Sequence, residues 1–139
     1  MPEKTLLGID FGRKKMGTAI GQTITKTAKA LKNIKANAGT PDWSQLDAVV
    51  NEWEVDGIVV GLPLNMDGSE QAISQQARQF ANELKKRYSI PIVLHDERLS
   101  TVEAKTIAFT QGGEKACQSD HVDSLAAQIV LESYLNTIT

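Results

Sequence analysis

The chain has 139 residues, of which 41% are apolar, with 15 basic and 17 acidic side chains and a formal net charge of −2. This length suits one domain over residues 1–139, and the composition excludes wholesale disorder and low-complexity repeats. No apolar run approaches the ~18 residues of a membrane span, and the first five residues lack the apolar stretch of a signal peptide. One cysteine cannot form an internal disulfide, which fits a reducing compartment. We therefore expect a cytoplasmic protein without a membrane partner.

Charge is distributed unevenly along the chain. Residues 1–40 contain eight basic and two acidic side chains, whereas the remaining 99 residues contain seven basic and fifteen acidic ones. A basic segment of this size either binds a polyanion such as a nucleic acid or forms the solvated faces of strands. The average charge alone therefore does not exclude a nucleic-acid partner.

Three strands are predicted first along the chain, over residues 5–11, 16–21 and 26–34. The first is a short apolar run that ends at the carboxylate of Asp10. Short turns separate the three segments, so they predict an antiparallel meander.

Four helices follow, and three of them have readable starting signals. Thr40 has the character of an N-cap with Pro41 in the first turn, ahead of a helix that reaches Trp53. Asp67 and Glu70 have the spacing of a capping box for a second helix, which ends in a basic run. Ser100 and Glu103 have the spacing of a second capping box, which starts a helix over residues 100–110, and the last helix is predicted from 122 nearly to the C-terminus.

Two apolar strands alternate with these helices, over residues 57–61 and 92–97. Crossover connections of this kind produce parallel pairing, whereas the first turns produce antiparallel pairing. The sequence therefore predicts an α/β fold with a mixed five-stranded sheet flanked by helices, in which a three-stranded antiparallel meander precedes βα units.

Acidic side chains occur where such a fold carries chemistry, at the carboxyl ends of strands. Asp10 ends the first strand, Glu97 ends the last strand, and Asp123 lies in the first turn of the final helix, three residues after Asp120. Their hard oxygen ligands favour Mg²⁺ or Mn²⁺. Alternatively, Glu97 forms a surface pair with Arg98 or Lys15, and the two helical acids favour the helix N-terminus. Asp10 is harder to explain structurally, because it interrupts an apolar strand.

Four sequence blocks resemble the successive motifs of the YqgF (RuvX) family: 8–12 (GIDFG), 59–68 (VVGLPLNMDG), 96–101 (DERLST) and 122–127 (VDSLAA). They occur in the family's order and span residues 6 to about 135. The resemblance implies an RNase H-like fold of the RuvC type and a bacterial nuclease, a hydrolase of phosphodiester bonds. It also implies a role in processing the 5′ end of precursor 16S rRNA during ribosome biogenesis, with precursor rRNA and ribosomal precursor particles as partners.

The family's acidic triad falls on Asp10, Glu97 and Asp123 of this sequence. The resemblance implies that these residues are catalytic and hold the metal. We expect two Mg²⁺ or Mn²⁺ ions, with Asp10 bridging them and Asp120 as a candidate fourth ligand.

Six side chains are candidate contacts to nucleic acid: Arg13, Lys14, Lys15, Arg98, Asn65 and His121. The first three follow Asp10 in a turn that is alternatively a solvated hairpin tip. Arg98 either contacts phosphate or orients a carboxylate, and Asn65 either contacts substrate or forms a turn. His121 stands where family members often carry a basic residue, and it replaces one only when protonated.

Two other functions remain open. A Holliday-junction resolvase acting on DNA in recombination and repair would be a two-fold dimer, because two symmetric cuts need two sites, whereas an rRNA nuclease can act as a monomer. A non-catalytic module that binds nucleic acid or a nucleotide is the other alternative, because residues 8–12 also resemble the phosphate loop of actin-like and sugar-kinase ATPases. Those ATPases need a second, duplicated domain, for which this chain is too short.

Overall fold

The computed structural model describes residues 4–96 and 121–137 of the chain. Within them the strands are β1 (Thr5–Asp10), β2 (Lys15–Gln22), β3 (Thr27–Ala30), β4 (Ile34–Asn37), β5 (Thr40–Pro41), β6 (Gly57–Leu62) and β7 (Ile92–Asp96). The helices are α1 (Trp43–Glu52), α2 (Ala72–Arg87) and α4 (His121–Thr137). None of these described helices has the combined length and apolar character that a membrane crossing requires.

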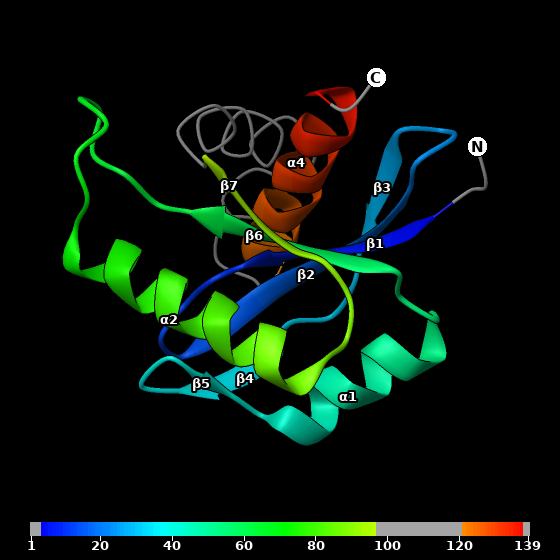
Figure 1. Cartoon of the computed structure of the whole chain (residues 1–139), viewed down its shortest axis with the longest axis horizontal. Coiled ribbons are helices and arrows are strands. Elements are labelled where there is room, and N and C mark those ends of the chain that lie inside the picture. Colours follow the sequence, from blue (N-terminus) through cyan, green and yellow to red (C-terminus); the bar gives the residue numbers. More distant parts are fainter. Residues whose placement is uncertain (1–3, 97–120, 138–139) are drawn as a thin grey trace.

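The strands form one mixed sheet with the order β5-β4-β2-β1-β6-β7, and β3 pairs with β2 off this path (Figure 1). β1 and β2 are antiparallel, whereas β1, β6 and β7 run parallel to one another. The helix α2 connects β6 to β7 as a crossover, which is the connection that parallel neighbours need. Antiparallel strands therefore come first and βα units follow, as predicted.

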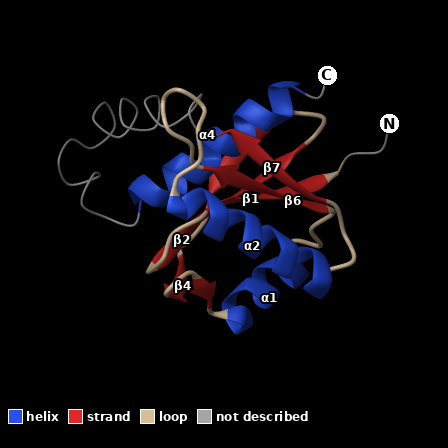
Figure 2. Ribbon diagram, turned by 60° about the vertical axis from the view of Figure 1, so that its left-hand side comes forward, coloured by secondary structure: helices blue, strands red, loops and turns tan. Residues whose placement is uncertain are grey.

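Helices cover both faces of the sheet, with α1 and α2 on one face and α4 on the other (Figure 1 and Figure 2). The strand side chains follow this arrangement, because successive residues of a strand point to opposite faces. Leu7 and Ile9 of β1 share a core with Phe80 and Leu84 of α2, whereas Leu6 packs with α4. The central strand β1 is thus buried on both faces.

Two glycines let α4 lie directly against the sheet. A Cβ atom added to Gly8 would lie 2.9 Å from Cβ of Leu131 and 3.1 Å from the carbonyl oxygen of Ala127. A Cβ atom added to Gly21 would lie 3.0 Å from Leu131 and 3.1 Å from Leu135. Because Gly21 pairs near the start of β1, α4 runs back along β1, and its first turn is directed toward the carboxyl end of that strand.

The prediction of one strand over residues 26–34 is wrong in its extent. The two short strands β3 and β4 replace it, and β5 follows, so the sheet contains seven strands instead of five. The strand is interrupted at Leu31 and Lys32, whose carbonyl oxygens accept hydrogen bonds from the side chains of Ser124 and Thr18. These side-chain contacts take the place of a continuous strand ladder.

The predicted start of the first helix is also wrong. Thr40 and Pro41 form β5, and α1 begins after Asp42. The carboxylate of Asp42 accepts hydrogen bonds from the backbone N–H groups of Ser44 and Gln45, at 3.0 and 3.3 Å. An aspartate that satisfies two N–H groups of the first turn caps the helix better than the threonine two residues earlier.

The second helix begins after Gln71 instead of at the predicted capping box. The carboxylate of Asp67 accepts hydrogen bonds from the backbone N–H and the hydroxyl of Ser69, at 2.9 and 2.6 Å. Glu70 forms an ion pair with Arg78 at 2.8 Å. Both acids of the predicted box therefore stabilise the loop ahead of α2 and its attachment to the helix.

Candidate active site at the carboxyl edge of the sheet

Asp10 is the last residue of β1 and lies at the edge of the sheet where β1, β6 and β7 all end. Leu6 packs with α4 and Gly8 lies against it, so Asp10, two positions further along the strand, points to the same face. Its cross-strand neighbour on β2 is Gly17, a residue without a side chain. The half-buried carboxylate thus lies on the α4 face, at the edge where open α/β sheets bind ligands.

The first turn of α4, which contains Asp123, approaches the same end of β1. Ala127 lies over Gly8, and Asp123 precedes Ala127 by one turn, about 6 Å along the helix axis. Asp10 follows Gly8 by two strand residues, about 6.6 Å. The backbone therefore directs the turn that carries Asp123 toward Asp10, on the face that Asp10 occupies.

A buried hydroxyl holds this first turn in place. Ser124 is 3% exposed, and its Oγ donates to the carbonyl oxygen of Leu31 at 2.6 Å and lies 2.8 Å from Oδ1 of Asn33. From β2, the fully buried Thr18 donates its hydroxyl to the carbonyl oxygen of Lys32 at 2.7 Å. The connection between β3 and β4 is therefore anchored to both α4 and β2.

Three predicted basic side chains, all of them exposed, lie in the turn between β1 and β2 and at the first residue of β2: Arg13, Lys14 and Lys15. Gly12 is needed at the start of this turn, because a Cβ atom there would lie 2.1 Å from the carbonyl oxygen of Lys15. The segment of β4 and β5 braces the turn, since the N–H of Gly39 donates to the carbonyl of Arg13 and that of Ala36 donates to the carbonyl of Lys14. The basic turn therefore has a defined position beside Asp10.

Lys15 and Lys35 form a pair of like charges next to this turn. They are cross-strand partners on β2 and β4, so their side chains share one face of the sheet. The next pair in the ladder, Met16 and Ile34, enters the core under α1 and α2, so both lysines point to the opposite face, which is that of Asp10. The two lysines therefore bring positive charge to the face of the sheet on which Asp10 lies.

Ser124 and Lys35 are not among the site residues predicted from the sequence. Ser124 shares the apolar stripe of α4 with Ala127 and Leu131, and a polar residue on such a stripe signals a buried hydrogen-bond partner. That signal is readable from the sequence. The pairing of Lys35 with Lys15 depends on a strand register that no local pattern encodes.

The strand β7 ends at Asp96, at the same edge of the sheet as Asp10. In the preceding residue, His95, the ring Nε2 lies 2.9 Å from Oγ of Ser133, and the ring meets Tyr134 edge-on. Burial lowers the pKa of His95 below its usual value, against a smaller opposite effect from Asp96. His95 is therefore a neutral, packed residue of the sheet at neutral pH.

Some predicted site residues lie outside the described residues: Glu97, Arg98 and Asp120. The backbone of α4 includes His121 and Asp123, but their side chains also lie outside the description. Within the described part, no three His, Cys, Asp or Glu side chains form a group that could hold a metal ion. Metal binding by the acidic triad therefore stays a prediction.

The donor chemistry at this edge fits a hard divalent cation. Asp10 contributes carboxylate oxygens, the ligand type that Mg²⁺ and Mn²⁺ prefer in proteins. The first turn of α4, which includes a second aspartate in its sequence, approaches the same position. The ligand type of Asp10 and the approach of the first turn of α4 to the end of β1 are thus compatible with a magnesium or manganese site.

Asn65 lies in the loop between β6 and α2, and its side chain is exposed. Its Nδ2 donates to Oγ of Ser69 at 2.9 Å, and its backbone N–H donates to the carbonyl oxygen of Ser69 at the same distance. Asn65 therefore closes a turn, as one of its two interpretations expects. A contact with nucleic acid stays a prediction.

Comparison with known proteins assigns the family. A family model described as "RuvX: Holliday junction resolvase" matches residues 4–137. The chain belongs to the RuvX family. Relatives named "Putative pre-16S rRNA nuclease" include one from Proteus mirabilis (strain HI4320), 52% identical over 134 residues that make up 96% of each chain. Another, from Escherichia coli O7:K1 (strain IAI39 / ExPEC), is 55% identical over 130 residues, 94% of each chain.

Solved structures of resolvases share the fold of this RuvX protein. The RuvC protein of T. thermophilus in complex with a Holliday junction substrate matches with a TM-score of 0.56 at 16% identity, over 96% of this chain and 94% of that one. The Fowlpox virus resolvase in complex with Holliday junction DNA matches with a TM-score of 0.57 at 12% identity, over 96% and 98%. The predicted RuvC-type, RNase H-like fold is confirmed.

Proposed function

We propose that this protein is a divalent-metal-dependent nuclease that hydrolyses phosphodiester bonds of precursor ribosomal RNA, at the 5′ end of 16S rRNA. The observation that carries the proposal is the position of Asp10 at the carboxyl edge of the sheet, on the face shared by the first turn of α4 and the pair of lysines. The names of relatives at 52% and 55% identity support the choice of substrate. We place the activity in the cytoplasm, with ribosomal precursor particles as partners.

In this proposal Asp10, Glu97 and Asp123 would hold two Mg²⁺ or Mn²⁺ ions, and Asp10 would be the ligand common to both. When bound, such ions lower the pKa of an attacking water and stabilise charge on the leaving oxygen. Asp10 keeps a fixed position, because β1 is hydrogen-bonded to strands on both sides and packed on both faces. Ser124 fixes the turn that contains Asp123, as supporting residues commonly do for metal ligands.

The basic side chains hold the substrate. Lys15 and Lys35 lie on the face of the sheet that carries Asp10. They bind the phosphate groups of the RNA that neighbour the cleaved phosphate. Arg13 and Lys14, on the adjacent turn, extend this contact. Phosphate contacts of this kind position a nucleic acid without reading its sequence, so selection of the cleavage site depends on other contacts.

Cleavage of four-way DNA junctions is the second candidate function. The description of the family and the resolvase structures that share this fold favour it. A resolvase needs two active sites related by two-fold symmetry to make paired cuts. This candidate therefore predicts a stable dimer, which the rRNA nuclease does not require.

Cleavage of matched substrates tests the proposal. The protein is incubated with single-stranded RNA, single-stranded DNA and a four-way DNA junction, with Mg²⁺, Mn²⁺ or EDTA. We expect metal-dependent cleavage of the RNA, with light scattering showing a monomer at the same concentration. Paired cuts in the junction by a dimer would favour the resolvase. No cleavage of any substrate would contradict the nuclease and favour a binding module.

A further inference from the structure

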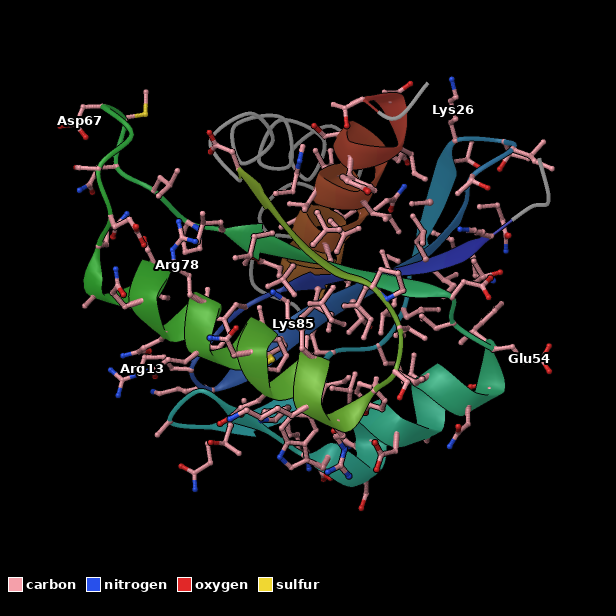
Figure 3. The ribbon with its side chains drawn as sticks, viewed as in Figure 1. Arg13, Lys26, Glu54, Asp67, Arg78 and Lys85 are labelled. Carbon is pink, nitrogen blue, oxygen red and sulfur yellow. The ribbon has the colours of Figure 1, made fainter. Side chains whose placement is uncertain are left out.

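The loop between β6 and α2, residues 63–71, projects from the carboxyl edge of the sheet and exposes a methionine. Figure 3 shows Asp67 at the far end of this loop, away from the body of the protein. The neighbouring Met66 is 90% exposed, and the other large apolar side chain that is mostly exposed in the described part, Ile24, is 63% exposed. One exposed methionine is ordinary on a protein surface, but three further features distinguish this one.

First, the loop is internally hydrogen-bonded. The N–H of Asn65 donates to the carbonyl oxygen of Ser69, and the N–H of Gly68 donates back to the carbonyl oxygen of Asn65, both at 2.9 Å. The hydroxyl of Ser69 donates to the carboxylate of Asp67 at 2.6 Å. Because Met66 lies between these bonded residues, its backbone is already ordered, and a partner would bind it at a small cost in conformational entropy.

Second, the base of the loop is attached to the helix that follows. Glu70 accepts hydrogen bonds from the guanidinium of Arg78 at 2.8 Å and from the side-chain amide of Gln75 at 3.0 Å. The hydroxyl of Ser74 donates to the carbonyl oxygen of Pro63 at the start of the loop. The loop therefore holds Met66 at a defined place relative to the sheet.

Third, the position and the charge of the loop select the chemistry of a partner. The strand β6 pairs with β1 in parallel register, Val60 beside Ile9, so the loop leaves the sheet at the edge where Asp10 lies. Residues 63–71 contain two acidic side chains and no basic one, which does not favour contact with phosphate. An exposed apolar side chain on a loop that starts at the edge of the candidate site instead fits the apolar face of a base.

We propose that Met66 packs against the face of an unpaired nucleobase in the part of the RNA strand that extends from the candidate site along this loop. This inference rests on the proposed nuclease function. A thioether is polarisable and makes favourable contacts with aromatic rings. Every nucleobase has such a face, so the contact would hold a single strand at the site without selecting one base.

The test uses single-stranded RNA that carries one 2-aminopurine, whose fluorescence reports stacking. Asp10→Asn serves as the parent protein, so that the RNA stays intact during the titration. Met66→Ala is then added, with Ile24→Ala as the matched control, because Ile24 is an exposed apolar residue in the β2–β3 turn at the opposite edge. Met66→Leu retains an apolar side chain of similar size.

We expect Met66→Ala to weaken RNA binding about threefold to tenfold. The change in 2-aminopurine fluorescence when the RNA binds should become smaller, and the salt dependence of binding should stay unchanged. Met66→Leu should stay within about twofold of the parent protein, since apolar contact is retained. Ile24→Ala should leave affinity and signal unchanged. Thermal unfolding of each variant shows that the exposed substitution leaves the fold intact.

Two results would overturn the base contact and leave the nuclease proposal in place. One is Met66→Ala binding with the affinity and signal of the Ile24→Ala control. The other is unchanged RNA binding with loss of binding to ribosomal precursor particles, which would assign Met66 to a protein partner. Absence of RNA binding by wild-type protein and parent alike would overturn both proposals.

Discussion

The hydroxyl of Ser124 donates to the carbonyl oxygen of Leu31 at 2.6 Å, although the two residues lie 93 positions apart in the chain. Ser124 is one residue after Asp123, and Leu31 precedes the β4 segment that carries Lys35. One buried hydrogen bond therefore connects the turn with a predicted metal ligand to the segment with a predicted phosphate contact. The positions of this turn and of this segment therefore both depend on how α4 packs against β1.

We predict that Ser124→Ala weakens metal binding as well as the fold. The substitution leaves the carbonyl oxygen of Leu31 without its side-chain donor, which costs about 1–3 kcal/mol of unfolding free energy. Urea unfolding measures this loss, and Mn²⁺ titration calorimetry measures the affinity. Ser133→Ala is the control, because Ser133 lies in the same helix and contacts His95 instead. Equal Mn²⁺ affinity in both variants would remove the positioning role of Ser124.

A second prediction concerns the turn between β1 and β2. In Gly12→Ala the new Cβ would lie 2.1 Å from the carbonyl oxygen of Lys15, so the turn must open. Displacements forced by an added methyl group in a close-packed site cost about 1–3 kcal/mol. We expect lower thermal stability and weaker RNA binding, because the basic side chains move relative to Asp10. Wild-type stability and affinity would show that the turn tolerates a side chain at this position.

A third prediction concerns phosphate binding by Lys15 and Lys35. Replacing either lysine with glutamine removes one phosphate contact, and the slope of log affinity against log salt concentration should fall by about 0.7 for single-stranded RNA. Lys86→Gln is the control, because Lys86 lies in the last turn of α2, which leads to the opposite edge. Slopes measured by fluorescence anisotropy should be lower for Lys15→Gln and Lys35→Gln and unchanged for Lys86→Gln. Equal slopes for all of them would exclude this pair as a phosphate site.

A fourth prediction follows from the lowered pKa of His95. Burial lowers its pKa in the folded state below the usual 6.5, so the unfolded chain binds a proton more readily. The stability contribution of neutral His95 is therefore complete above about pH 6.5 and is lost as the pH falls below that value. Urea unfolding between about pH 7.5 and 5.5 should show this decline, and His95→Gln should reduce it. An equal decline in wild type and variant would contradict the assignment.

The carboxylate of Asp47 contributes to stability in a lower pH range and leaves that test undisturbed. Asp47 accepts hydrogen bonds from Arg87 and Tyr88, and the bond from Arg87 has the largest effect in lowering its pKa from 3.8 to about 2. The stability it contributes is present above pH 3.8 and is lost as the pH falls toward 2. The two pH windows do not overlap.

The sequence predicts those parts of the fold that local patterns encode. The apolar runs that end at Asp10 and begin at Gly57 are strands, because continuous apolar character is typical of strands buried on both faces. The starts of α1 and α2 were beyond local patterns. Asp42 and Thr40 are both possible N-caps of α1, and Asp42 is the one that bonds to the first turn. Asp67 is a possible N-cap of α2 but bonds to Ser69 in a turn instead. The hydrogen bonds formed in the folded chain thus decide which of several similar residues caps a helix.

Some features of the candidate site can likewise be predicted from the sequence, and others cannot. The acid at the end of β1 and the basic turn after it are visible in sequence, because each is a local feature at a strand end. The contact of Ser124 with Leu31 and the pairing of Lys15 with Lys35 join segments that are distant in the chain. Such contacts follow from sheet register and helix seating, which no window of neighbouring residues determines.

Loss of RNA cleavage in Asp10→Asn tests the central claim most directly. Asp56→Asn is the matched control, because Asp56 accepts a hydrogen bond from the N–H of Thr5 at the opposite end of β1. With Mg²⁺ or Mn²⁺ present, the wild type and the control should cleave single-stranded RNA, whereas Asp10→Asn should remain folded and show only background cleavage. Cleavage by Asp10→Asn at the wild-type rate would contradict the assignment of Asp10 as the shared metal ligand.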